Sequence, residues 1–161
     1  MPMQLFNQKK LPNAWKLGKS GVDANDYACN ALSVASLASY FNPFKMIYSS
    51  DFILSDLYSP EGMLDYDRLN EFLKKNGYGF EYVGSTSDLA TAAKFADPKN
   101  PNAAVIVMVK IKGVFTHFMV GVSYSPIVGW RVADTLTGTI RLLSLCGYGK
   151  AVSYRLYKRL K

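Results

Sequence analysis

Histidine and cysteine are scarce in this sequence. Its 161 residues include one histidine, His117, and two cysteines, Cys29 and Cys146. So few and so dispersed soft ligands make a poor zinc or iron site, and we expect no metal and no other cofactor. Two cysteines also make no disulfide framework, which favours a reducing compartment. We interpret Cys146 as structural, because no second histidine is present to serve it.

Long apolar runs are missing as well. No segment approaches the roughly 20 uninterrupted apolar residues that a membrane-spanning helix needs. The first ten residues lack the apolar core of a secretory signal, so we expect no membrane span and a cytoplasmic location. Zinc-finger spacings and glycine-rich phosphate loops are absent too, and nucleic acid is therefore not an expected partner.

The composition that remains is that of a globular chain. Hydrophobic residues make up 49% of the sequence and charged residues 19%, which excludes an extensively disordered protein. At this length one hydrophobic core is the simplest solution, so we expect residues 1–161 to form a single domain.

The two halves of the chain differ in their residue patterns. Residues 1–27 are punctuated by proline, glycine and turn formers and are expected to be irregular. Helical patterns with caps then predict helices over 29–41, 50–57, 65–76 and 87–96. β-Branched runs parted by turns predict strands over 103–111, 114–124, 128–133, 139–145 and 151–157. The sequence thus predicts an α+β fold, in which a helical N-terminal half packs its central helix, 29–41, against a C-terminal antiparallel sheet.

Three residues with catalytic potential lie on these predicted elements, and their order along the chain is informative. Cys29 begins the most apolar helix, where the positive end of the helix dipole favours a thiolate. His117 lies in a predicted strand, and Asp134 ends the next strand. A hairpin through the turn at 125–126 would bring 116–118 near 133–135. The order Cys, His, Asp is that of a thiol triad in which the carboxylate orients the imidazole.

The segments around these residues resemble those of papain-like cysteine peptidases. The resemblance is to the branch of the bacteriocin-leader (double-glycine) peptidases and their bacterial and phage relatives. It is carried by the Ala-, Ser- and Leu-rich helix 29–38, by His-Phe-Met-Val-Gly-Val-Ser-Tyr at 117–124 and by Trp-Arg-Val-Ala-Asp-Thr-Leu-Thr-Gly at 130–138. Trp-Lys-Leu-Gly at 15–18 also resembles wall-associated members. The resemblance spans about residues 8–145 and implies a papain-like fold with a triad of Cys29, His117 and Asp134.

Two positions depart from the pattern of this family. Asn30 follows the nucleophile where glycine is usual, and Asp23 stands six residues before it, where a glutamine often supplies an oxyanion-hole donor. An ionised carboxylate cannot donate a hydrogen bond. We therefore expect the oxyanion hole to use the backbone N–H of Cys29 together with Asn25.

The resemblance implies a cysteine peptidase or amidase that cleaves an amide through a thioester at Cys29. Within that class we favour a peptidoglycan-hydrolysing, endolysin-type enzyme or a protein-processing enzyme of phage or bacterial origin. Two alternatives remain open. One is a transglutaminase-like acyltransferase, and the other is a catalytically weak or inactive papain-like module that binds or builds structure.

The chain is also basic, with a net charge of +7. Part of this charge gathers at the C-terminus, in Lys150, Arg155, Lys158, Arg159 and Lys161. Such a face favours an anionic partner, here an anionic wall polymer beside the peptide or peptidoglycan substrate. It equally fits an edge strand that is protected by its charges from aggregation. An enzyme without a signal would reach the wall through a holin-type route or as part of a virion.

Overall fold

The computed structural model describes residues 3–113 and 115–160 of the chain. Within these residues, five α-helices accompany a six-stranded antiparallel sheet. The helices are α1 (Ala24–Tyr27), α2 (Cys29–Phe41), α3 (Ser49–Ile53), α4 (Tyr66–Lys75) and α5 (Leu89–Phe95). The strands are β1 (Phe80–Thr86), β2 (Ala103–Ile111), β3 (Phe115–Ser125), β4 (Gly129–Asp134), β5 (Thr139–Leu142) and β6 (Ala151–Arg159). Short 3₁₀ turns, η1 (Gln8–Lys10) and η2 (Leu143–Leu145), complete the order.

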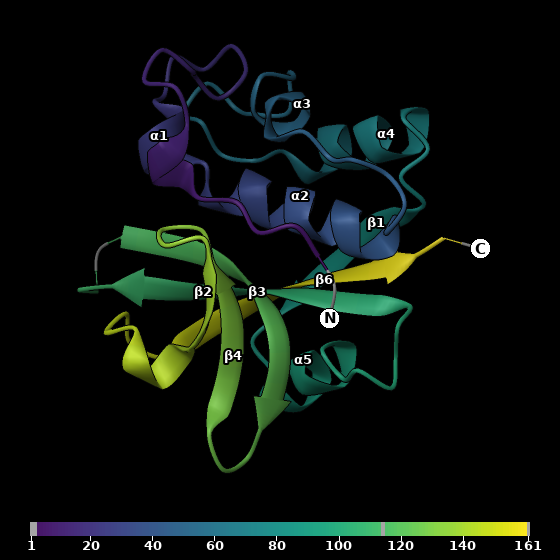
Figure 1. The fold of residues 1–161 in the computed structure, drawn as a ribbon, viewed down its shortest axis with the longest axis vertical. Coiled ribbons are helices and arrows are strands. Elements are labelled where there is room, and N and C mark those ends of the chain that lie inside the picture. The colour runs from purple at the N-terminus through teal and green to yellow at the C-terminus, as the bar shows by residue number, and fades with distance from the viewer. Residues whose placement is uncertain (1–2, 114, 161) are drawn as a thin grey trace.

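The sheet separates two apolar cores. Its strand order is β1-β6-β2-β3-β4-β5. Side chains alternate along β2, so that Ala104 and Ile106 face α2 while Val105 and Val107 face α5. In Figure 1, α2 crosses one face of the sheet and α5 lies against the other. The α+β class and the central helix on the sheet are therefore as predicted.

The central helix is buried almost all round. Eleven of its thirteen residues are buried, serines included. Ser33 and Ser39 donate their hydroxyl protons to backbone carbonyls of the preceding turn, Cys29 and Ser36, which satisfies these groups inside the core. Such a helix needs layers on both sides, and it finds them in the sheet on one side and in α3 on the other.

Local capping explains where the outer helices begin. Asp65 caps α4 by accepting from the backbone N–H groups of Asp67 and Arg68, and Asp88 caps α5 by accepting from Thr91. The helix predicted over 50–57 is observed as α3, which is shorter than predicted and begins earlier in the sequence. Its N-cap is Tyr48 and its last residue is Ile53. The strand predicted over 139–145 is likewise too long, because the chain turns into η2 after Leu142.

One strand, β1, was not predicted, and it changes the place of the basic C-terminal segment. β1 pairs with β6 with a bulge between Tyr82 and Gly84, and Gly84 has φ of 147°, which L side chains rarely adopt. Because β1 covers one side of β6 and β2 the other, β6 is an interior strand. The interpretation of 151–157 as a charged edge strand is therefore wrong.

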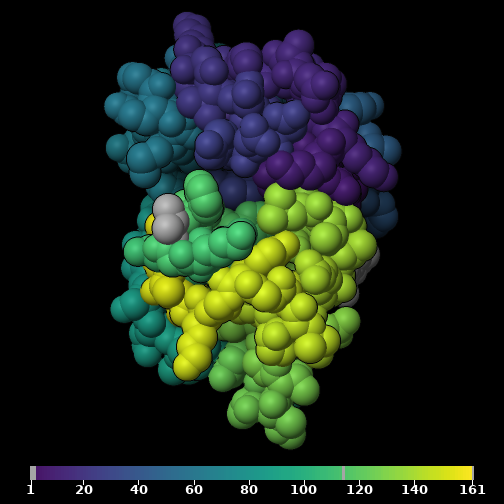
Figure 2. Space-filling view, turned by 90° about the vertical axis from the view of Figure 1, so that its left-hand side faces the viewer, coloured from purple at the N-terminus to yellow at the C-terminus, as the bar shows by residue number. Residues whose placement is uncertain are grey.

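The two halves of the chain meet along a line across the molecule. Figure 2 shows residues of the N-terminal half, with α1 and α2, above the strands of the C-terminal half. Cys29 belongs to α2, whereas His117 and Asp134 belong to β3 and β4. Across 3–113 and 115–160, none of the helices has the length and apolar character that crossing a membrane requires.

Candidate active site

Cys29 is the first residue of α2 and follows a break in the helical chain. α1 ends at Tyr27, and Ala28 belongs to neither helix. No side chain caps α2, and the first N–H groups of a helix have no partner within it. The backbone N–H of Cys29 and the positive end of α2 therefore lie beside the Cys29 thiol. Cys29 is itself 7% exposed, at the floor of a cavity.

His117 connects Cys29 to Asp134. Its Nε2 lies 3.0 Å from Asp134 Oδ1 across the β3–β4 hairpin, and the Cys29 side chain lies close enough to raise the pKa of the ring. Because Nε2 is taken by the carboxylate, Nδ1 is the nitrogen left for sulfur. The predicted hairpin thus brings His117 to Asp134, with Val120 opposite Ala133 in the ladder. The structure brings all three side chains together.

The surroundings of His117 favour its protonated form. Burial alone lowers the pKa of this imidazole, but the hydrogen bonds and negative charges of Asp134 and Cys29 outweigh burial and raise the pKa to about 9. An imidazolium with a carboxylate on one nitrogen and a sulfur on the other stabilises a thiolate. Such a ring can also deliver a proton to a leaving group.

Asp134 is held by more groups than the histidine alone. Arg141 Nη1 donates to its Oδ2 at 3.0 Å, the Tyr148 hydroxyl donates to the same oxygen at 2.6 Å, and the backbone N–H of Leu136 donates to Oδ1. Burial raises the pKa of this carboxyl, yet the hydrogen bonds from His117, from Tyr148 and from the Leu136 N–H, together with the charge of His117, lower it to about 2. Asp134 is therefore ionised and fixed in orientation.

Gln8 joins the two halves of the site. Its side-chain amide donates to the carbonyls of Asn25 and Asp26 in α1, at 3.3 and 3.2 Å. Its Oε1 accepts from the Thr135 hydroxyl at 2.8 Å, next to Asp134. The same buried side chain thus fixes the turn before Cys29 relative to the strand end that carries Asp134. No sequence motif marks Gln8, because its role depends on contacts 17 to 127 residues away.

A cavity of about 850 Å³ opens over this arrangement and includes Cys29 and His117 in its lining. Its other walls come from α1, the segment 61–66, the β2–β3 hairpin and β6. Most of these walls are apolar and include Tyr27, Met63, Leu64, Met108, Phe115 and Phe118. A cavity of this size and character suits a peptide-sized ligand.

The two residues discussed for the oxyanion hole lie elsewhere. The Asn25 side-chain amide donates to Asn13 at 3.0 Å, and Asn25 is not among the residues that line the cavity. The structure therefore does not bring Asn25 to the thiol. Asp23 pairs with Lys16 on the surface, so its carboxylate does not enter the cavity either. Asn30, which follows the nucleophile, does line the cavity, and its Nδ2 lies 3.0 Å from the Tyr66 hydroxyl.

Cys146 stands apart from the cavity. Its thiol donates to the carbonyl of Leu142 at 3.3 Å, after η2. Burial, aided by the charge of Asp134, raises the pKa of this thiol despite the nearby Arg141 guanidinium. Both observations agree with a structural cysteine and leave Cys29 as the reactive candidate.

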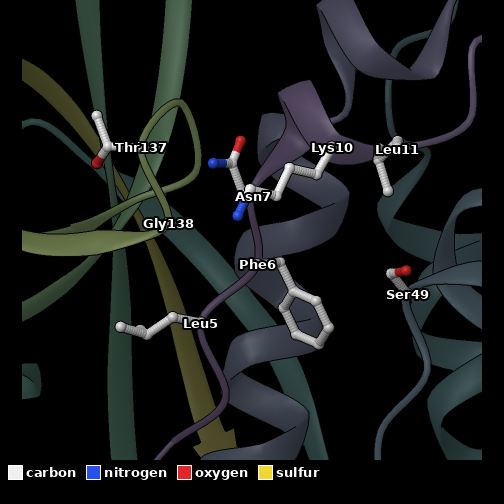
Figure 3. A pocket seen from close by; sticks show the side chains of 8 residues that line it. All are labelled: Leu5, Phe6, Asn7, Lys10, Leu11, Ser49, Thr137 and Gly138. Carbon is white, nitrogen blue, oxygen red and sulfur yellow. The ribbon is translucent and has the colours of Figure 1, made fainter.

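The second cavity is smaller and holds different chemistry. It measures about 320 Å³ and lies beside the N-terminal segment, between that segment and the β4–β5 turn. Figure 3 shows Leu5, Phe6 and Asn7 on this segment with Thr137 and Gly138 opposite. Among the described residues that line it, Lys10 carries the only charge, and none is a His, Cys, Asp or Glu.

Neither metal ligands nor relatives add to this description. In the part of the chain that the structure describes, no three His, Cys, Asp or Glu side chains converge as a metal site would require. No family model matches the chain, and a search of curated proteins finds no match. The chemistry of the site therefore rests on its geometry.

Proposed function

We propose that this protein is a papain-like cysteine peptidase or amidase with Cys29 as nucleophile, His117 as acid and base, and Asp134 as the residue that orients His117. One observation carries the proposal. The only imidazole of the chain hydrogen-bonds with Asp134, lies close enough to the Cys29 side chain for that side chain to raise the pKa of the imidazole, and lines a large cavity together with Cys29. A structural cysteine needs neither the imidazole nor the opening.

The first half of the reaction forms a thioester. The Cys29 thiolate attacks the carbonyl carbon of the substrate amide, and a carbon–sulfur bond forms as the carbonyl oxygen takes up negative charge. His117 then gives the proton on Nδ1 to the leaving nitrogen as the carbon–nitrogen bond breaks. The amine departs and the acyl group remains on sulfur.

The second half releases the acid. His117, now neutral, accepts a proton from water while the oxygen attacks the thioester carbon. The carbon–sulfur bond breaks, the carboxylic acid leaves, and the thiolate faces an imidazolium again. Asp134 keeps the ring in orientation during both halves, and its ionised state suits that role.

The developing oxyanion needs hydrogen-bond donors near the sulfur. The backbone N–H of Cys29 supplies one, since it begins α2 without a cap. The side-chain amide of Asn30 lines the same cavity and replaces Asn25 as our candidate for a second donor. Asn30 Oδ1 is buried without a hydrogen-bond partner, whereas Tyr66 could donate its hydroxyl proton to it if the amide were turned over.

Within the peptidases and amidases, we favour amide bonds of peptidoglycan or of a processed protein as substrates. The mostly apolar cavity fits a peptide, and the net charge of +7 suits an enzyme that works among anionic wall polymers.

Alkylation of Cys29 tests the proposal. In a Cys146→Ser background, so that one thiol reports, the rate of reaction with iodoacetamide is measured from pH 5 to 9 with and without His117→Ala. We expect a reaction that stays fast at low pH and becomes at least about tenfold slower near pH 6 in the variant. Digestion of peptidoglycan and of peptide libraries by the same protein, with and without an added amine, then separates hydrolysis from acyl transfer.

A contrary result is equally clear. If the alkylation rate climbs only near the pKa of about 8.5 that free thiols have, and ignores His117→Ala, then Cys29 is an ordinary thiol and the protein is a binding module. Circular dichroism of the His117→Ala variant checks that a change in its alkylation rate is not caused by loss of the fold.

A further inference from the structure

Arg155 lies in the wall of the Cys29 cavity. It projects from β6, and it is the only lysine or arginine among the residues that line this cavity. From the sequence alone, Arg155 is expected to belong to the basic face near the C-terminus. The structure separates it from Lys158, which lies over the Phe95 ring on the α5 side of the sheet.

The guanidinium of Arg155 is held firmly by neutral groups. Its Nε donates to the Tyr66 hydroxyl at 3.2 Å, its Nη1 to Ser153 Oγ at 2.6 Å, and its Nη2 to Met108 Sδ at 3.8 Å. It also stacks 5.6 Å from the centre of the Phe118 ring. A guanidinium has five N–H donors, so two remain for a ligand.

No carboxylate of the described chain neutralises this charge. Among the described residues, Arg155 forms no ion pair. Two carboxylates lie in the cavity lining, but Asp26 pairs with Lys9 and Glu61 belongs to the exposed rim. The cavity wall therefore presents a fixed, half-buried positive charge that an anionic ligand would neutralise.

A short chain of hydrogen bonds links this charge to the nucleophile. Arg155 binds the Tyr66 hydroxyl, Tyr66 binds the side chain of Asn30, and Asn30 follows Cys29 in α2. The guanidinium therefore has a fixed position relative to the sulfur.

We propose that Arg155 is a carboxylate-binding, specificity-determining residue, so that the substrate carries a carboxylate close to its scissile amide. This inference rests on the proposed function, because it names the substrate class of the same site. The planar fork of arginine matches a carboxylate with two parallel hydrogen bonds. The carboxylate belongs either to an acidic side chain or to a free C-terminus.

Alkylators that differ only in charge test this proposal. Bromoacetyl-glycine, bromoacetyl-β-alanine and bromoacetyl-γ-aminobutyric acid are each compared with their primary amides in the Cys146→Ser background. We expect the acid-to-amide rate ratio to peak at one spacer length and to fall about tenfold there in Arg155→Gln. Arg155→Lys keeps the charge and loses the fork, so it should fall in between. Lys158→Gln removes a charge from the same strand outside the cavity and should keep the wild-type ratio.

The two proposals fail separately in this experiment. Amide rates that ignore His117→Ala would overturn the thiol–imidazole pair, whereas an unchanged ratio in Arg155→Gln at every spacer would overturn the carboxylate subsite.

A binding measurement does not depend on the reactivity of the thiol. In Cys29→Ala protein, NMR titration compares acetyl-alanyl-alanine with its amide, and acetyl-aspartyl-alanine amide with the asparaginyl peptide. We expect one acid to bind about tenfold more tightly than its neutral partner, and the pair that does so tells a C-terminal carboxylate from an acidic side chain. Equal binding of both acids and their neutral partners would contradict the proposal.

Discussion

At the scale of single residues, the candidate site is an arrangement of charges that support one another. Asp134 is buried and ionised, and it accepts hydrogen bonds from His117, Arg141 and Tyr148. His117 is buried and protonation is favoured by its two neighbours. Burial of either charge alone would be costly, so each depends on the other.

Because the chain has a single histidine, this dependence should be visible in the pH dependence of stability. The pKa of His117 is raised from 6.5 to about 9 in the folded protein. The stabilisation is therefore complete below pH 6.5 and is lost as the pH rises through about 9. We expect the free energy of unfolding of Cys29→Ser protein, in which no thiol at position 29 titrates beside the imidazole, to fall as the pH rises across this window, as measured by urea denaturation.

The matched variant is His117→Gln, which keeps polar atoms in place of the ring but does not titrate. Its unfolding free energy should change much less between these pH values. A decline of equal size in both proteins would mean that another group is responsible. Asp134 has the opposite pH dependence. Because its pKa is lowered, its stabilisation of the folded protein is lost only as the pH falls through about 2.

At the scale of elements, the site depends on where helices and strands stop. α2 starts at Cys29 because the chain breaks at Ala28, and β4 ends at Asp134, whose carbonyl accepts from Gly138 in the turn to β5. The N-terminal segment ties these two ends together through Gln8. The turn before Cys29 is therefore held by a residue that none of the motifs at 15–18, 29–38, 117–124 and 130–138 contains.

Gln8→Ala should reveal this positioning role. The change leaves two carbonyls and the Thr135 hydroxyl without their partner, so we expect a loss of about 3 kcal/mol in the free energy of unfolding. In addition, the alkylation of Cys29 at low pH should slow several-fold, with a changed pH profile. Iodoacetamide kinetics and urea denaturation measure the two effects.

Gln4→Ala is the control from the same segment. The Gln4 side chain bonds the backbone of Ile47 at 2.9 and 3.1 Å, away from the cavity. We expect this variant to lose stability and to keep the wild-type pH profile of alkylation. If Gln8→Ala behaves like Gln4→Ala in both measurements, then Gln8 stabilises the fold and does not position the site.

At the scale of the whole molecule, the basic residues of the C-terminal segment lie in two different environments. Arg155 turns into the cavity, and Arg159 donates to the Phe41 carbonyl at 3.1 Å and lies over the Phe41 ring. Lys150 and Lys158 stay exposed, and Lys161 lies outside the described residues. The exposed charges are the ones that an anionic polymer would meet.

We therefore expect the protein to bind dextran sulfate and not dextran at low ionic strength. Binding should weaken steeply as salt rises, because the screening length is about 10 Å at 0.1 M. Lys150→Gln with Lys158→Gln should weaken the binding further, and sedimentation at several salt concentrations measures it. Binding that is insensitive to salt, or equal for both polymers, would argue against an electrostatic surface.

The sequence predicted most of the elements and the three residues that lie together at the candidate site. Periodicity and caps are local signals, so α2, α4, α5 and the strands from β2 onward were expected within a few residues. β1 escaped because Gly84 and the bulge interrupt its alternation. The order of Cys29, His117 and Asp134 is also legible in the chain, because residue type and element type suffice to suggest it.

Only the tertiary structure decided which other side chains complete the site. Gln8, Tyr148 and Arg155 come from distant segments, and Asn25 is directed to Asn13. The reason is physical. A hydrogen bond between residues 127 apart, or a guanidinium turned inward from an interior strand, is set by the packing of the sheet against α2. Local residue patterns carry no record of that packing.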